Sequence, residues 1–126
     1  MDLLKKVVEL EQAADKLGLR WENTSQIMDQ IQSECAEINV HLNEKASPDN
    51  QAELQEEIGD LLHAVFSLCV FCNLNPKETL EITLAKFERR LNAVKQLTHE
   101  HGLSTLEGLS FAELMDIWKR AKQLVG

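Results

Sequence analysis

Apolar residues recur every three or four positions along most of this chain, and few residues interrupt that recurrence. There are only two prolines, five glycines and no tyrosine among 126 residues. Spacings of three and four keep apolar side chains on one face of an α-helix, whereas a half-buried strand needs strict alternation. The pattern therefore predicts an all-α fold. Because a chain of this length has room for one modest core, we expect a single domain spanning residues 1–126.

Start and stop signals divide the chain into a helical bundle of about five helices. Asn75 followed by Pro76 opens one helix, and Ser110 with Glu113 forms a capping box that opens the last. Residues 46–50, Ala-Ser-Pro-Asp-Asn, are predicted to form a turn, because Pro and Asp are poorly suited to continuing a helix. The expected helices span residues 2–17, about 24–45, 51–73, 76–101 and 111–124.

The segment 61–72 is apolar on nearly every side apart from His63 and Ser67. A helix of this kind is normally buried by several neighbours. The other helices of one small chain provide too little cover, so we expect a homodimer or a larger assembly.

Charge and cysteine content narrow the possible partners and location. The chain has 21 acidic and 13 basic residues, giving a net charge of −8, which argues against binding to nucleic acid or to an anionic membrane. No apolar run approaches the roughly 18 residues of a membrane helix, so a cytoplasmic protein is expected. Cys35, Cys69 and Cys72 are expected to be reduced thiols that pack as small core side chains.

Two acidic pairs with the same spacing flank the predicted turn: Glu34 with Glu37, and Glu57 with Asp60. Each pair lies beside an apolar helical stripe, and antiparallel packing across the turn would bring the pairs face to face. Four close carboxylates cannot all stay ionised without a cation, and Mg²⁺ or Mn²⁺ accepts oxygen ligands. The two stripes are predicted to be Ile27, Ile31, Cys35, Ile38 and Leu42 on one helix, and Leu54, Ile58, Leu61, Val65 and Cys69 on the other.

A cationic cluster follows on the next predicted helix. Lys86 and Arg90 lie four residues apart on one face, with Arg89 beside them. Beside a multi-carboxylate metal site, this combination suggests a polyphosphate ligand, whose remaining charge Lys and Arg would neutralise. The last helix carries Trp118 and, one turn on, Lys122; Trp118 is either a core residue or a surface on which a base stacks.

These motifs resemble a known family. Glu34-x-x-Glu37, then nineteen residues, then Glu-Ile-Gly-Asp-Leu-Leu at 57–62, then Lys-Phe-Glu-Arg-Arg at 86–90 is similar to the MazG-like nucleoside triphosphate pyrophosphohydrolases of the all-α NTP pyrophosphatase group. The resemblance extends from about residue 19 to residue 122 and is greatest to the C-terminal catalytic domain of two-domain MazG proteins.

The resemblance implies a four-helix core completed by dimerisation, in a homodimer or homotetramer. It implies Mg²⁺-dependent hydrolysis of an NTP or dNTP to the nucleoside monophosphate and pyrophosphate, in nucleotide-pool house-cleaning. The implied residues are Glu34, Glu37, Glu57 and Asp60 as metal ligands, Lys86 and Arg90 with neighbouring Arg89 at the triphosphate, and Trp118 and Lys122 at the nucleotide.

The chain departs from the family pattern at three positions. The family usually has Glu at Ser33, Lys at Gln30 and Asn at Leu84. If the acid missing at Ser33 orients the attacking water, Glu56 is one candidate to replace it. The changes at Gln30 and Leu84 remove polar contacts to the substrate, which predicts slow turnover or an unusual substrate.

Two other functions fit parts of the pattern. A di-iron carboxylate bundle would use Glu-x-x-His on two helices, and Asp60-Leu-Leu-His63 is a single approximate copy. A non-catalytic helical interaction module would use the acidic face to bind a basic partner and would need no metal.

Overall fold

The computed structural model describes all 126 residues, and every regular element in it is an α-helix. The predicted all-α class with about five helices is confirmed. The chain divides into two compact units, Met1–Thr79 and Leu80–Gly126, and the boundary falls within the helix that spans Pro76–Glu100. The helices are α1 (Leu3–Leu17), α2 (Thr24–Leu42), α3 (Pro48–Phe71), α4 (Pro76–Glu100) and α5 (Phe111–Val125).

Most of the predicted helix ends are confirmed. The Asp2 carboxylate accepts a hydrogen bond from the backbone N–H of Lys5 and caps α1. Gly18 follows α1 with φ of 88°, a left-handed conformation that glycine adopts without steric cost. Asn23 caps α2 through the backbone N–H of Gln26. These local signals set the ends because each satisfies backbone groups that the helix itself leaves unpaired.

The turn between α2 and α3 differs from the predicted one at both ends. α2 ends at Leu42 rather than near Lys45, and α3 begins at Pro48 rather than at Gln51. The Ser47 hydroxyl accepts from the backbone N–H of Asn50, which makes Ser47 the N-cap. Pro48 therefore starts the helix, because a first-turn residue needs no N–H donor.

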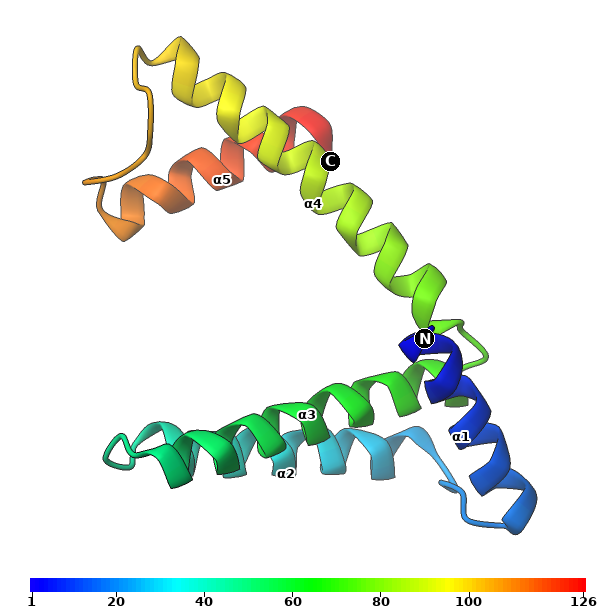
Figure 1. Cartoon of the computed structure of the whole chain (residues 1–126). Helices are drawn as coiled ribbons and strands as arrows, with labels where there is room; N and C mark the ends of the chain where they lie inside the picture. The colour runs from blue at the N-terminus through cyan, green and yellow to red at the C-terminus, as the bar shows by residue number, and fades with distance from the viewer. The chain divides into compact units, whose positions relative to one another are not determined.

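α2 and α3 pack side by side and antiparallel (Figure 1). The faces turned toward each other differ by about one residue from the predicted stripes. Cys35, Ile58 and Val65 are exposed, whereas Glu34 is only 7% exposed and Glu57 is half-buried. Carboxylates thus occupy seam positions that were assigned to apolar residues. The seam consists of Ile27, Ile31, Glu34, Ile38 and His41 on α2, and of Asn50, Leu54, Glu57, Leu61 and Ala64 on α3.

The prediction that the cysteines pack as core side chains is wrong in this structure. Cys35 and Cys72 are exposed and Cys69 is half-buried, and all three are free thiols. Cys35 lies outside the α2–α3 seam because the adjacent Glu34 occupies the inward position. Cys72 follows the last residue of α3 as its C-cap.

Helix α1 also contacts α3 within the first unit. The Ser67 hydroxyl donates to Glu11 Oε1 over 2.6 Å, and His63 Nε2 lies 2.8 Å from the same oxygen. His63 is thus engaged by α1. Asn75 caps α4 through the backbone N–H of Glu78, as predicted.

The second unit contains a small core between α4 and α5. Ala93, Leu97 and Ala121 are buried together, with Val94 and Ile117 against them. The predicted capping box is present: Glu113 N–H donates to Ser110 Oγ, and Ser110 N–H donates to Glu113 Oε1. The box fixes where α5 begins.

The apolar part of α3 is only partly covered by the other helices of the first unit. Leu62, Val65 and Phe71 are exposed by 54%, 40% and 37%, so α1 and α2 do not bury this segment on every side. The homodimer stays a prediction. No single helix is long and apolar enough to cross a membrane alone; only α3 and α4 taken together as one broken segment meet that criterion.

Candidate functional site

Three predicted metal ligands come together in the α2–α3 seam. One carboxylate oxygen from each of Glu34, Glu37 and Glu57 lies within 4.8 Å of the other two. Glu34 and Glu37 are almost one turn apart on α2, and Glu57 reaches them from α3. We call these three residues the carboxylate centre.

The carboxylate centre contains buried oxygen atoms that the chain does not satisfy. Glu34 Oε2 and Glu57 Oε2 are both buried without a hydrogen-bond partner. The other oxygen of Glu34 accepts a 2.7 Å hydrogen bond from Gln30 Nε2. Gln30 therefore fixes the orientation of Glu34 and leaves Oε2 without a partner, which is costly for a buried acceptor.

The pKa of Glu57 is raised because three carboxylates lie close together. Hydrogen bonding of its protonated form to Glu37, burial, hydrogen bonding to Glu34 and the negative charges of both neighbours together raise this pKa from 4.5 to about 7. Two carboxylates have no donor to share unless one of them holds a proton. Near neutral pH, Glu57 is therefore close to the midpoint of its titration, and a nearby cation would favour its ionised form.

The donor atoms of the carboxylate centre fit a hard divalent cation. All three residues offer carboxylate oxygens, the ligand type that Mg²⁺ and Mn²⁺ prefer, and no nitrogen or sulfur atom belongs to the group. The two unsatisfied oxygens would gain a partner from such an ion. Asp60 is exposed and lies three residues beyond Glu57 on α3, outside the group of three.

The other predicted residues of the first unit lie outside the carboxylate centre. Ser33 and Glu56 are exposed next to Glu34 and Glu57 in sequence. His63, the histidine of the di-iron alternative, pairs with Glu11 of α1. His63 does not belong to the carboxylate centre, which contains no histidine, whereas a di-iron bundle would use Glu-x-x-His on two helices.

The predicted phosphate and base contacts lie in the second unit. Arg90 Nε donates to the backbone oxygen of Gly126 over 3.0 Å, and its guanidinium lies 5.8 Å from the centre of the Trp118 ring. Phe87 contacts the same ring, with centroids 5.9 Å apart. Lys86 and Arg90 are half-buried on one face of α4, and neither forms an ion pair with Glu88.

Trp118 is half-buried and is held by α4 through Phe87 and Arg90. Arg89 and Lys122 are exposed. The structure thus groups Arg90 with Trp118, although the sequence pattern assigns them to different parts of the ligand.

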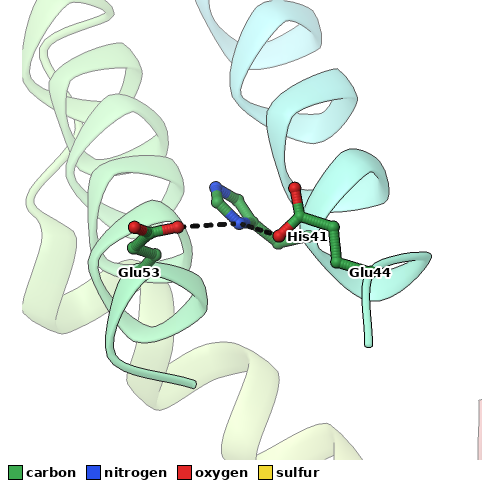
Figure 2. A group of neighbouring side chains, drawn as sticks. All are labelled: His41, Glu44 and Glu53. Atoms are coloured by element: carbon green, nitrogen blue, oxygen red, sulfur yellow. Dashed lines mark ion pairs between the residues drawn. The ribbon is translucent and has the colours of Figure 1, made fainter. Parts of the chain in front are cut away.

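Sequence reasoning missed a second cluster at the end of the α2–α3 hairpin. His41 Nδ1 lies 3.5 Å from Glu44 Oε2 and 3.5 Å from Glu53 Oε2, so the imidazole is placed between two carboxylates (Figure 2). We call these three residues the His41 cluster. A sequence signal existed: His41 follows Glu37 by four residues and Glu53 precedes Glu57 by four, which continues the carboxylate pattern by one helical turn.

Comparison with known proteins shows which relatives share this chain's pattern. No family model matches the chain. It is 31% identical over 113 residues, 90% of its length, to the nucleoside triphosphate pyrophosphohydrolase/pyrophosphatase MazG of Thermotoga maritima. It is 24% identical over 120 residues, 95% of its length, to the nucleoside triphosphate pyrophosphohydrolase of Escherichia coli K12.

The chain spans less than half of these relatives, 41% of the first and 44% of the second. A shorter match, 30% identical over 74 residues, is to the uncharacterized protein YabN of Bacillus subtilis. The resemblance to the MazG-like family is confirmed by the two MazG-type relatives.

Proposed function

Because this chain is MazG-like over nine-tenths of its length, we propose that it hydrolyses nucleoside triphosphates to the monophosphate and pyrophosphate with Mg²⁺. The observation that supports this proposal best is the carboxylate centre, with its two buried oxygens that lack partners. A group of carboxylates whose negative charge no neighbouring side chain compensates is suited to binding a cation. The role in nucleotide-pool house-cleaning and the cytoplasmic location are part of the proposal.

The proposed metal ligands are Glu34, Glu37, Glu57 and Asp60. When bound, Mg²⁺ supplies positive charge that polarises the phosphate chain and lowers the pKa of water. Glu57 would be ionised with the ion bound, because a nearby divalent charge favours the carboxylate form. Gln30 holds Glu34 in place through its 2.7 Å hydrogen bond and thus keeps one ligand oriented.

The attacking water needs a group that accepts its proton. Ser33 has no carboxylate, so we propose that exposed Glu56, adjacent to Glu57, accepts the proton of the attacking water. Exposure allows the proton to pass to solvent. Attack at the α-phosphorus would then release pyrophosphate as the leaving group.

Substrate binding is assigned to the cationic face of α4 and to α5. Lys86 and Arg90, with Arg89, would neutralise triphosphate oxygens, and the Trp118 ring with Lys122 would contact the nucleoside part. Lys86→Ala and Arg90→Ala should each raise KM, because the phosphate charge is present in the ground state, and should lower kcat because charge grows on the leaving pyrophosphate in the transition state. Unchanged kcat/KM in both variants would remove this face from the binding site.

The decisive experiment identifies the phosphate product. The chain is incubated with a panel of NTPs and dNTPs, with Mg²⁺ and with EDTA, and the products are separated. Pyrophosphate plus a monophosphate, formed only with metal, is the expected result. Orthophosphate plus a diphosphate would reject attack at the α-phosphorus. No product from any nucleotide would favour the non-catalytic interaction module.

A further inference from the structure

The His41 cluster lies outside the residues assigned to hydrolysis. His41 and Glu44 come from the end of α2 and the turn after it, and Glu53 comes from the second turn of α3. One ligand atom of each residue lies within 4.8 Å of the other two. Residues on both sides of the turn therefore present one nitrogen and two carboxylates to the same point (Figure 2).

The distances around His41 Nδ1 suit a metal ion better than a set of hydrogen bonds. Asn50 Oδ1 is 3.1 Å from Nδ1, and the Glu44 and Glu53 oxygens are each 3.5 Å away. One nitrogen carries one proton, so three oxygen atoms cannot all be well bonded to it, and 3.5 Å is long for a hydrogen bond. Ligands about 2.0–2.2 Å from a tetrahedral ion lie about 3.4 Å from one another.

The charge of the cluster also favours a divalent ion. Glu44 and Glu53 together carry two negative charges, and protonation of His41 compensates one of them. A divalent ion bound to the neutral imidazole compensates both. Because Glu57 lies one turn from Glu53 on α3, the added charge also reduces repulsion along the hairpin.

The imidazole is held in position before any ion arrives. Asn50 Nδ2 donates to the backbone oxygen of His41 over 3.2 Å, which fixes the amide so that Oδ1 faces Nδ1. The backbone N–H of Asn50 is in turn bonded to Ser47, the cap of α3. The Asn50 amide oxygen thus lies next to the same imidazole nitrogen that would bind an ion.

We propose that His41, Glu44 and Glu53 form a second metal site at the hairpin end, selective for Zn²⁺ and similar transition-metal ions. Imidazole nitrogen with carboxylate oxygens suits such ions, whereas Mg²⁺ prefers the all-oxygen carboxylate centre. The ion replaces the proton on His41 Nδ1, and Asn50 Oδ1 is available for the fourth position. By joining residues on both sides of the turn, the ion ties α2 to α3.

Zinc binding in the presence of excess Mg²⁺ tests the proposal. The excess Mg²⁺ competes for the carboxylate centre, as the proposed function requires, and isothermal titration with Zn²⁺ should find a site at the hairpin end. His41→Ala should weaken that site at least about tenfold. His63→Ala is the matched control, because it removes a histidine of the same unit that pairs with Glu11 instead. Equal zinc affinity in both variants, or no zinc bound by the wild type, would overturn the proposal.

Two measurements distinguish zinc held by the His41 cluster from zinc held by cysteine thiolates. Co²⁺ in place of Zn²⁺ should give visible bands without the intense near-ultraviolet band of thiolate ligation; the presence of that band would implicate the cysteines and overturn the proposal. Glu53→Gln should lose the same site while circular dichroism shows unchanged helicity, so loss of binding is not confused with unfolding. Retention of full zinc affinity in Glu53→Gln would exclude the proposed ligand set.

Discussion

The carboxylate centre and the His41 cluster occupy adjacent turns of α2 and α3 but differ in the groups around their carboxylates. In the His41 cluster an imidazole stands between Glu44 and Glu53, and Asn50 bonds to it. Hydrogen bonding to Asn50, followed by the charges of Glu44 and Glu53, raises the pKa of His41 above 6.5 against the opposing effect of burial. This cluster therefore places a protonatable nitrogen between its two carboxylates.

The carboxylate centre has only acceptors, apart from the amide of Gln30. Its shortage of positive charge appears as the raised pKa of Glu57 and as two buried oxygens without partners. The two layers share the same seam and differ in charge, because only the His41 cluster has a nitrogen base beside its carboxylates.

Glu57→Gln should produce the largest effect. It removes a proposed ligand, so metal-dependent pyrophosphate release should fall by about 100-fold or more. Without metal, melting should stay the same or rise slightly, since the amide mimics the protonated carboxyl. Glu9→Gln on α1 is the control, because it removes one charge from an exposed position outside both clusters. Full activity in Glu57→Gln would remove Glu57 from the site.

The second largest effect should be the change in the stability of the folded chain with pH. The pKa of Glu57 is about 7 in the folded chain and near 4.5 when unperturbed, so the folded state binds more protons between these values. Stability in EDTA should therefore fall as pH rises from about 4.5 to about 7. Mg²⁺ should restore several degrees of melting temperature at the alkaline end. A melting temperature independent of pH and of Mg²⁺ would contradict the crowded centre.

His41 contributes in the same direction but at higher pH. Its pKa is raised, so the stabilisation is complete below 6.5 and is lost as pH rises through the folded value. NMR titration of the imidazole separates the two groups. Glu57→Gln should flatten the lower part of the stability profile and lower the pKa of His41 slightly, because the Glu57 charge is the smallest of the effects that raise it.

Gln30→Lys should give the carboxylate centre the internal cation that it lacks. The ammonium would pair with Glu34, lower the pKa of Glu57 and raise the melting temperature in EDTA by a few degrees at neutral pH. Calorimetry of Mg²⁺ binding should show weaker affinity, since the cation competes with the ion. If melting and Mg²⁺ affinity both match the wild type, Gln30 does not control the charge of this layer.

Asn50→Ala should have the smallest effect. It removes the hydrogen bonds to His41 Nδ1 and to the His41 backbone oxygen, which span 3.1 and 3.2 Å. The pKa of His41 should fall toward its ordinary value, and melting should drop by a few degrees. NMR titration and thermal melting measure the two changes. An unchanged His41 titration would show that the carboxylates alone raise the pKa.

The sequence predicts the all-α class and most helix caps, because local spacing and capping chemistry determine them. It also predicts that Glu34, Glu37 and Glu57 lie close together. The sequence does not predict which residues form the contact between α2 and α3. Choosing apolar residues for each stripe put Cys35 inward and Glu34 at the edge, whereas the structure does the reverse. When acidic residues are assumed to be exposed, a helix face is misplaced by one residue wherever a carboxylate is buried. The His41 cluster was missed for another reason: Glu44 and Glu53 are exposed, and Glu44 lies in the turn beyond the end of α2.

The short turn of residues 43–47 has a consequence for how the hairpin assembles. His41 and Asn50, nine residues apart, can meet after closure of a very small loop, whereas Glu34 and Glu57 are much farther apart along the chain. Contacts between α2 and α3 should thus form first next to the turn, and the carboxylate centre should form later. Because Mg²⁺ needs the carboxylate centre, it should mainly slow unfolding and should do little to speed the first steps of folding.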